Sequence, residues 1–211
     1  MTQNWNRTDD AAPRIKICGI RDPETAMTAV ESGADAIGFV LAPGSPRTIS
    51  HRDAVRIAEL LPDHVEAVGV FVDGGFDSDL QPWQPRWTQL HGNEDEDLVR
   101  RISGPVIRAV PFDGPSLLRW DAADGIDRLL VDNERPGSGQ RFDHAAFLEI
   151  RDRLRTPIVL AGGLGPDTVG ESIRVLRPWG VDVSSGVEST PGTKEPALIR
   201  EFCHAVRESV A

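Results

Sequence analysis

Short apolar segments recur at fairly regular intervals along the chain, and they predict eight β-strands. Several of these segments are apolar at almost every position, which is typical of strands that are buried on both faces of a parallel sheet. The predicted strands cover residues 14–18, 34–41, 66–72, 86–91, 105–110, 128–132, 157–162 and 180–185.

Segments of helical length separate most of the predicted strands. They carry helix-capping residues, such as Ser50 before one segment and Pro166 at the start of another. The connections after the third and fifth strands are rich in glycine and proline, and we expect short or irregular helices there. The predicted helices cover residues 22–33, 50–61, 95–103, 142–154, 167–176 and 195–210.

The alternation of eight strands with helices predicts an α/β fold, a single-domain (β/α)8 TIM barrel that spans residues 14–211. The alternative is an open, doubly wound sheet, but the sequence lacks the Gly-x-Gly-x-x-Gly motif that often follows the first strand of such folds. Residues 1–13 are polar, and we expect them to form a flexible tail. In a TIM barrel the residues at the carboxyl ends of the strands form the catalytic face, so we expect the functional residues at these positions.

The composition argues against several classes of protein. A net charge of −10 and an isoelectric point near 4.9 disfavour nucleic-acid binding. The N-terminus has no signal-peptide pattern and no apolar stretch is long enough to span a bilayer, so we expect a cytoplasmic protein without a membrane partner. Cys18 and Cys203 lie far apart in the sequence, which indicates free thiols and neither a disulfide framework nor a metal site.

Polar and reactive side chains collect at the ends of the predicted strands, among them those of Cys18, Arg47, His91 and Asp132. Glycines and serines follow the last two strands, where TIM barrels commonly bind phosphate through backbone N–H groups. We therefore expect a phosphate site formed by Gly162, Gly163, Ser184, Ser185 and Gly186.

In order and spacing, the motifs KICGI, QLHG, LLVDN, LAGGL and GVDVSSGVE closely resemble those of the phosphoribosylanthranilate isomerases of tryptophan biosynthesis. The resemblance extends from Arg14 to about Phe202. It implies an Amadori rearrangement that converts N-(5-phosphoribosyl)anthranilate to 1-(2-carboxyphenylamino)-1-deoxyribulose 5-phosphate without a cofactor. The expected partner is this small phosphorylated substrate, and we expect a monomer or a homodimer.

The resemblance also implies roles for individual residues. Cys18 corresponds to the general base, Asp132 to the general acid and Arg47 to the residue that engages the anthranilate group. A free cysteine needs a modest downward shift of its pKa to act near neutral pH, and we expect nearby N–H groups or positive charges to supply it. Further substrate contacts are implied for His91, Gly137, Ser138, Gly139 and Asp182.

Two other functions are compatible with this sequence. One is the related sugar isomerase of the histidine pathway, alone or with dual specificity, but those barrels carry an aspartate at the position of Cys18. The other is a barrel that binds a phosphorylated ligand without catalysis, and turnover by the purified protein distinguishes it from an enzyme.

Overall fold

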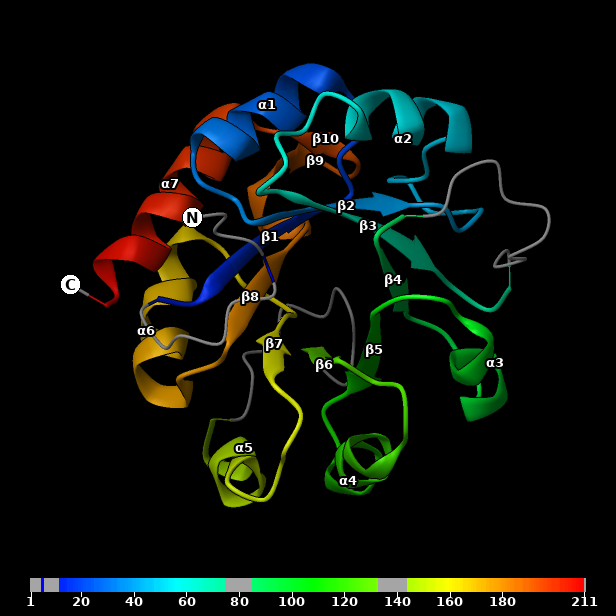
Figure 1. Ribbon diagram of the computed structural model, residues 1–211. Coiled ribbons are helices and arrows are strands. Elements are labelled where there is room, and N and C mark those ends of the chain that lie inside the picture. Colours follow the sequence, from blue (N-terminus) through cyan, green and yellow to red (C-terminus); the bar gives the residue numbers. More distant parts are fainter. Residues whose placement is uncertain (1–4, 6–11, 75–84, 133–143, 211) are drawn as a thin grey trace.

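Eight parallel strands form a closed barrel, which confirms the predicted TIM-barrel fold. The computed structural model describes residues 5, 12–74, 85–132 and 144–210. Each strand pairs with the next, and the first pairs with the last (Figure 1). The strands are β1 (Arg14–Cys18), β2 (Ala36–Val40), β3 (Glu66–Phe71), β4 (Trp87–Leu90), β5 (Val106–Pro111), β6 (Arg128–Asp132), β7 (Ile158–Leu160) and β8 (Gly180–Val183).

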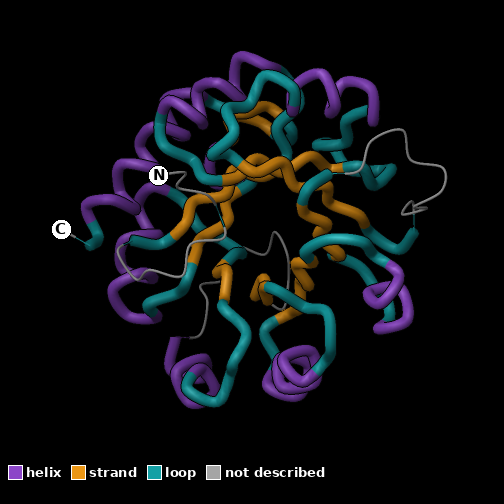
Figure 2. The backbone as a smooth tube through the Cα atoms, in the orientation of Figure 1, coloured by secondary structure: helices purple, strands orange, loops and turns teal. Residues whose placement is uncertain are grey.

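The helices surround the strands as an outer layer, so that the purple tubes enclose the orange ring in Figure 2. This arrangement explains why the strands are apolar on both faces: one face packs inside the barrel and the other against helices. Within the described ranges, no helix has the length and apolar character needed to cross a membrane. The helices are α1 (Pro23–Glu31), α2 (His51–Ala58), α3 (Glu96–Arg101), α4 (Gly114–Ala122), α5 (His144–Arg151), α6 (Pro166–Leu176) and α7 (Pro196–Glu208).

The connection after β5 is more regular than its glycine and proline content suggested, because it contains the nine-residue helix α4. The side chain of Asp113 caps this helix by accepting a hydrogen bond from the backbone N–H of Ser116 at 2.8 Å. Pro115 occupies the first turn, where its missing N–H leaves no helical hydrogen bond unmade. The glycine and proline therefore mark the start of a helix and do not prevent one.

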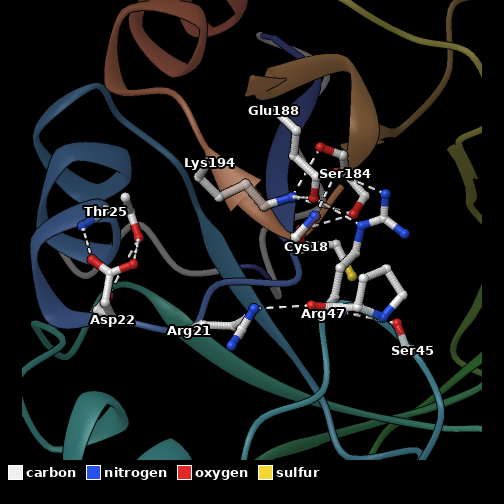
Figure 3. A network of polar contacts seen from close by, with 11 residues as sticks. Cys18, Arg21, Asp22, Thr25, Ser45, Arg47, Ser184, Glu188 and Lys194 are labelled. Atoms are coloured by element: carbon white, nitrogen blue, oxygen red, sulfur yellow. Dashed lines mark hydrogen bonds and ion pairs between the residues drawn. The ribbon is translucent and has the colours of Figure 1, made fainter. Parts of the chain in front are cut away.

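A small antiparallel hairpin follows β8, which the sequence pattern did not predict. It consists of β9 (Glu188–Thr190) and β10 (Thr193–Lys194), and a short 3-10 helix (Ser185–Val187) precedes it. The hairpin brings the side chains of Glu188 and Lys194 to the carboxyl end of β1 (Figure 3). It therefore contributes to the same end of the barrel as the predicted catalytic face.

Trp5 is fully buried at the amino-terminal end of the barrel. Its ring packs edge-on against Trp179, with ring centroids 4.9 Å apart, and against Trp87, with centroids 6.3 Å apart. The predicted flexibility of residues 1–13 is not tested, since most of them lie outside the described residues. The polar sequence around Trp5 gave no indication that its ring is buried.

We expect Trp5→Ala to lower the free energy of unfolding by about 3 kcal/mol, because truncating a buried aromatic removes apolar contacts and leaves a cavity. Trp5→Phe is the matched control and is expected to lose less, since it keeps a ring at the same place. Both variants should keep the parent kcat because Trp5 lies at the end of the barrel opposite the strand ends that carry Cys18 and Asp132. Chemical denaturation measures the effect, and a Trp5→Ala protein as stable as the parent would show that this contact contributes nothing.

Candidate active site

Cys18 is the last residue of β1, and its side chain is buried at the carboxyl end of the barrel. The next residue, Gly19, has a φ of +80°, a conformation that favours glycine, and its N–H donates to the carbonyl of Gly38 at 2.8 Å. The carbonyl of Cys18 accepts a hydrogen bond from the hydroxyl of Ser184 at 3.1 Å. These backbone contacts fix the thiol between β2 and the loop after β8 (Figure 3).

Lys16 lies one layer below Cys18, inside the barrel, and is completely buried. Its ammonium group donates to the Asp182 carboxylate at 2.9 Å, and its positive charge lies close to the Cys18 side chain. Gly38 leaves room for this meeting, because a Cβ atom there would lie 2.9 Å from both the Cys18 Sγ and the Lys16 Nζ. The structure thus places Asp182 in a buried ion pair, and whether it also contacts substrate stays a prediction.

The electrostatic setting of Cys18 differs from the one expected. Burial raises the pKa of the Cys18 thiol, and the opposing positive charges of Lys16 and Lys194 do not fully offset it. The nearby Asp182 carboxylate also raises this pKa. The expected net downward shift is therefore wrong for this structure, although the expected positive charges are present.

Glu188 links two cations beside Cys18. Its carboxylate accepts two hydrogen bonds from the Arg47 guanidinium, both at 2.8 Å, and one from Lys194 at 2.8 Å (Figure 3). Burial opposes ionisation of Glu188, but the hydrogen bonds from Arg47 and Lys194 outweigh it and lower the pKa to about 2. Lys194 also donates to the Ser184 carbonyl at 2.9 Å.

This network includes two residues that sequence reasoning did not select, Glu188 and Lys194. Both lie in the stretch GVDVSSGVESTPGTK, but neither stands at the end of a predicted strand. Arg47 and Glu188 are 141 positions apart, so only the closed fold brings them together. The sequence signal that could have identified Glu188 and Lys194 is their charge, since both follow closely after the predicted phosphate region.

Asp132 is the last residue of β6, and His91 follows β4. The Nε2 atom of His91 lies 3.4 Å from an Asp132 carboxylate oxygen, and its Nδ1 atom lies 2.9 Å from the amide nitrogen of Gln89. The Nδ1 atom of His91 thus faces Gln89, and its Nε2 atom faces Asp132. The structure therefore brings the predicted residues His91 and Asp132 together, with Gln89 as an unpredicted third member.

A buried ion pair holds the loop that carries His91. Arg108 donates to the Glu94 carboxylate at 2.8 Å and to the Gly92 carbonyl at 2.7 Å. Glu94 accepts in turn from the backbone N–H groups of Gly92 at 2.7 Å and Asp73 at 2.9 Å. The loops after β3 and β4 are thus fixed to one another at the carboxyl end of the barrel.

The loops after β7 and β8 approach each other closely in the predicted phosphate region. Gly162 and Gly163 have φ angles of +77° and +69°, and helix α6 begins shortly after them. A Cβ atom on Gly186 would lie 1.9 Å from the Leu164 carbonyl oxygen, so only glycine fits there. Ser184 and Ser185 complete this region, at the start of the 3-10 helix and close to the start of α6.

We expect Gly186→Ala to raise KM for a phosphorylated substrate by about tenfold, because the new methyl group must displace the Leu164 backbone and with it the loop after β7. Gly170→Ala is a useful control: it introduces a methyl group inside helix α6, where the nearest neighbouring side-chain atom would be 3.4 Å from the new Cβ. Steady-state kinetics measures both variants. An unchanged KM in folded Gly186→Ala protein would show that this close approach does not shape the binding site.

Three of the predicted substrate-binding residues lie in a segment that the structure does not describe. Gly137, Ser138 and Gly139 lie outside the described residues, so their predicted substrate contacts are not tested.

A cavity of about 980 Å³ opens at the opposite end of the barrel, lined by residues such as Arg128, Trp179 and Arg174, and none of the predicted site residues lines it. The described residues contain no cluster of side chains suited to hold a metal ion.

Comparison with known proteins agrees with this geometry. Residues 15–205 match a family model described as N-(5'phosphoribosyl)anthranilate (PRA) isomerase. A protein named N-(5'-phosphoribosyl)anthranilate isomerase from Trichlorobacter lovleyi is 42% identical, and the alignment covers 93% of this chain and 99% of the relative. A protein with the same name from Thermotoga maritima is 44% identical, with 90% and 96% covered.

Solved structures are similar over nearly the whole chain. The phosphoribosyl anthranilate isomerase of Thermotoga maritima superposes with a TM-score of 0.85 at 42% identity, covering 93% of this chain and 99% of that structure. A phosphoribosyl anthranilate isomerase in complex with reduced 1-(o-carboxyphenylamino)-1-deoxyribulose 5-phosphate has a TM-score of 0.82 at 41% identity, with the same coverage. Another structure describes monomers generated from the dimeric Thermotoga maritima protein.

Proposed function

The chain belongs to the N-(5'-phosphoribosyl)anthranilate isomerase family, and we propose that Cys18 and Asp132 carry out the two proton transfers of its reaction. The observation that carries this proposal is their placement at the carboxyl ends of β1 and β6. In the strand order of the barrel, β8 and β7 lie between these strands, so the two side chains face the mouth from different sides. A substrate in the mouth can therefore meet one group on each side.

The first step is opening of the ribose ring of N-(5'-phosphoribosyl)anthranilate. Asp132 in its protonated form gives its proton to the ring oxygen, the bond between this oxygen and C1′ breaks, and a Schiff base forms with the anthranilate nitrogen. His91 lies beside Asp132 and orients its carboxyl group by the 3.4 Å contact. After this step Asp132 is a carboxylate.

The second step is loss of the proton at C2′, which the Schiff base has made acidic. The Cys18 thiolate accepts this proton, and the electron pair of the C–H bond moves to form an enamine. Tautomerisation of the enamine to the ketone gives the aminoketose product, 1-(2-carboxyphenylamino)-1-deoxyribulose 5-phosphate. In the tautomerisation the C2′ hydroxyl loses its proton and C1′ gains one. Since the substrate takes one proton from Asp132 and gives one to Cys18, Cys18 releases a proton to solvent and Asp132 takes one up before the next turnover.

Substrate binding divides between the two sides of the Cys18 site. Arg47 uses Nε and Nη2 to hold Glu188, which leaves its Nη1 and the face of its guanidinium for the anthranilate carboxylate and ring. The phosphate group binds at the N–H groups of the loops after β7 and β8, around Gly163 and Gly186. These two regions flank Ser184, whose hydroxyl bonds to the Cys18 carbonyl.

We also propose that the protein works in the cytoplasm, as a monomer or a homodimer. Both described cysteines are free thiols, which fits a reducing compartment. The acidic composition fits a protein that stays dissolved at high concentration.

Iodoacetamide is expected to inactivate the enzyme by labelling Cys18. The product analogue, reduced 1-(o-carboxyphenylamino)-1-deoxyribulose 5-phosphate, is expected to protect Cys18 from labelling. Alkylation requires the thiolate, and burial raises the pKa of Cys18, so the rate should increase about tenfold per pH unit from pH 7 to 8.5. Because the base must also be a thiolate, kcat/KM should rise over the same range. Cys203 is fully buried in α7, and burial raises its pKa to about 12, so it should remain unlabelled.

Mass spectrometry after partial inactivation measures which thiol is labelled. If the loss of activity tracks a label on Cys203, or if labelled Cys18 leaves activity intact, Cys18 is not the base. A pH-independent rate of inactivation would show that the Cys18 thiol is already ionised at neutral pH.

A further inference from the structure

The interior of the barrel carries an ion pair directly beneath the proposed base. Lys16 is 0% exposed, and its Nζ lies 2.9 Å from an Asp182 carboxylate oxygen. Interior layers of TIM barrels are dominated by branched apolar side chains, which fill the space without a desolvation cost. A buried ion pair stabilises a fold little, and sometimes less than apolar side chains of the same volume. Packing alone therefore does not explain the presence of Lys16.

The contacts of Lys16 indicate what it does. Its ammonium group donates a hydrogen bond to Asp182, and its positive charge acts on the Cys18 thiol nearby. The absence of a side chain at Gly38, on the neighbouring strand, leaves the space in which the Cys18 sulfur and the Lys16 nitrogen meet. Lys16 thus lies between the base and a carboxylate on β8.

The charges that face Cys18 come from five different parts of the chain. Lys16, Lys194 and Arg47 are positive, and Asp182 and Glu188 are negative, which leaves one positive charge in excess when Cys18 carries its proton. When Cys18 loses its proton, the net charge of these five side chains and the thiolate together is zero. The cluster is therefore balanced when the base is in its working, thiolate form.

We propose that Lys16, held in place by Asp182, is a positioning residue that supplies the positive charge that stabilises the Cys18 thiolate. The proposal rests on the proposed role of Cys18 as the base. Lys16 keeps its own proton throughout, because Asp182 and Cys18 raise its pKa more than burial lowers it. The proton that leaves Cys18 passes to solvent, and the proton from C2′ then comes to the sulfur.

Two variants that shift the thiol in opposite directions test this inference. Asp182→Asn removes the negative charge and leaves Lys16 beside the thiol, so Cys18 should ionise more readily. Lys16→Met with Asp182→Asn removes both charges without leaving either one unpaired in the barrel, so Cys18 should ionise less readily. Both proteins are made with Cys203→Ala, so that Cys18 is the single thiol and iodoacetamide reports on it alone.

At pH 8 we expect alkylation of Cys18 to be about tenfold faster in Asp182→Asn than in the Cys203→Ala parent, and about tenfold slower in the Lys16→Met/Asp182→Asn protein. Circular dichroism and a cooperative unfolding transition establish that each protein is folded. A purely structural role would loosen the barrel in both variants and shift both rates in the same direction. That result, or unchanged rates in both, would overturn the inference.

Steady-state kinetics supplies the second readout. Since Lys16 lies below the base and away from the mouth, the Lys16→Met/Asp182→Asn protein should lose kcat at pH 7.5 and keep KM within about twofold of the Asp182→Asn protein, in which any substrate contact of Asp182 is already changed. The lost kcat should recover in part as the pH is raised, because the thiolate then forms without help. Alkylation needs no turnover, so opposite shifts in its rate would support the role of Lys16 even if another residue proved to be the base.

Discussion

Asp132→Asn is expected to lower kcat by about 10³-fold or more while the protein stays folded, because an amide has no acidic proton to give to the ring oxygen. The asparagine keeps the size and polarity of the side chain at the end of β6, and it can still contact His91. Binding of substrate should be affected much less than its conversion. The expected signature is therefore a large change in kcat and a small change in KM, measured by steady-state kinetics.

Asp127→Asn is the matched control for this experiment. Asp127 lies next to the other end of β6, where its carboxylate accepts a hydrogen bond from the N–H of Val106 at 2.9 Å. The same chemical change there is expected to cost some stability and to leave kcat within about twofold of the parent. A kcat for Asp132→Asn within tenfold of the parent would rule out Asp132 as the general acid.

Cys18→Ala is expected to lower kcat by about 10³-fold as well, because it removes the group that takes the C2′ proton. Cys18→Ser should lose nearly as much, since an alcohol of similar size is too weakly acidic to supply an anionic base near neutral pH. Cys18→Asp restores a base at this position and should recover part of the lost activity. This order of activities distinguishes loss of a base from loss of packing, because Cys18→Ser keeps the packing.

Cys203→Ala provides the comparison for a thiol outside the site. Cys203 is fully buried in α7, and its replacement is expected to lower stability and to leave kcat near that of the parent. If Cys18→Ala converts substrate as fast as the parent, the thiol-base mechanism is wrong and another residue must take the C2′ proton.

The strand ends could be predicted because burial imposes a simple pattern. A strand that packs on both faces is largely apolar, so a polar or reactive residue at its carboxyl end, such as Cys18 or Asp132, marks the mouth of the barrel. The strand ranges followed from the same rule, and β1 was found with its observed bounds. The resemblance of the motifs then assigned roles to these positions.

The contacts between strand ends could not be predicted, since they depend on the closed barrel. Lys16 belongs to the strand RIKIC, whose sequence gives no sign that its ammonium group would meet Asp182, 166 positions away. The pairing of Arg47 with Glu188 has the same origin. The direction of the Cys18 pKa depended on how deeply the thiol is buried, and a sequence does not report burial at a strand end.

The reaction itself provides the most direct test that Cys18 and Asp132 perform the two proton transfers. Purified protein is mixed with freshly prepared N-(5'-phosphoribosyl)anthranilate, and the loss of anthranilate-type fluorescence is followed for the parent and for the Cys18→Ala/Asp132→Asn protein. The proposed mechanism predicts a rapid decrease in fluorescence with the parent. With the double variant, it predicts a decrease no faster than in a solution without enzyme. A rapid decrease with the folded double variant would contradict the assignment of these two residues, and a flat trace with the folded parent would contradict the activity itself.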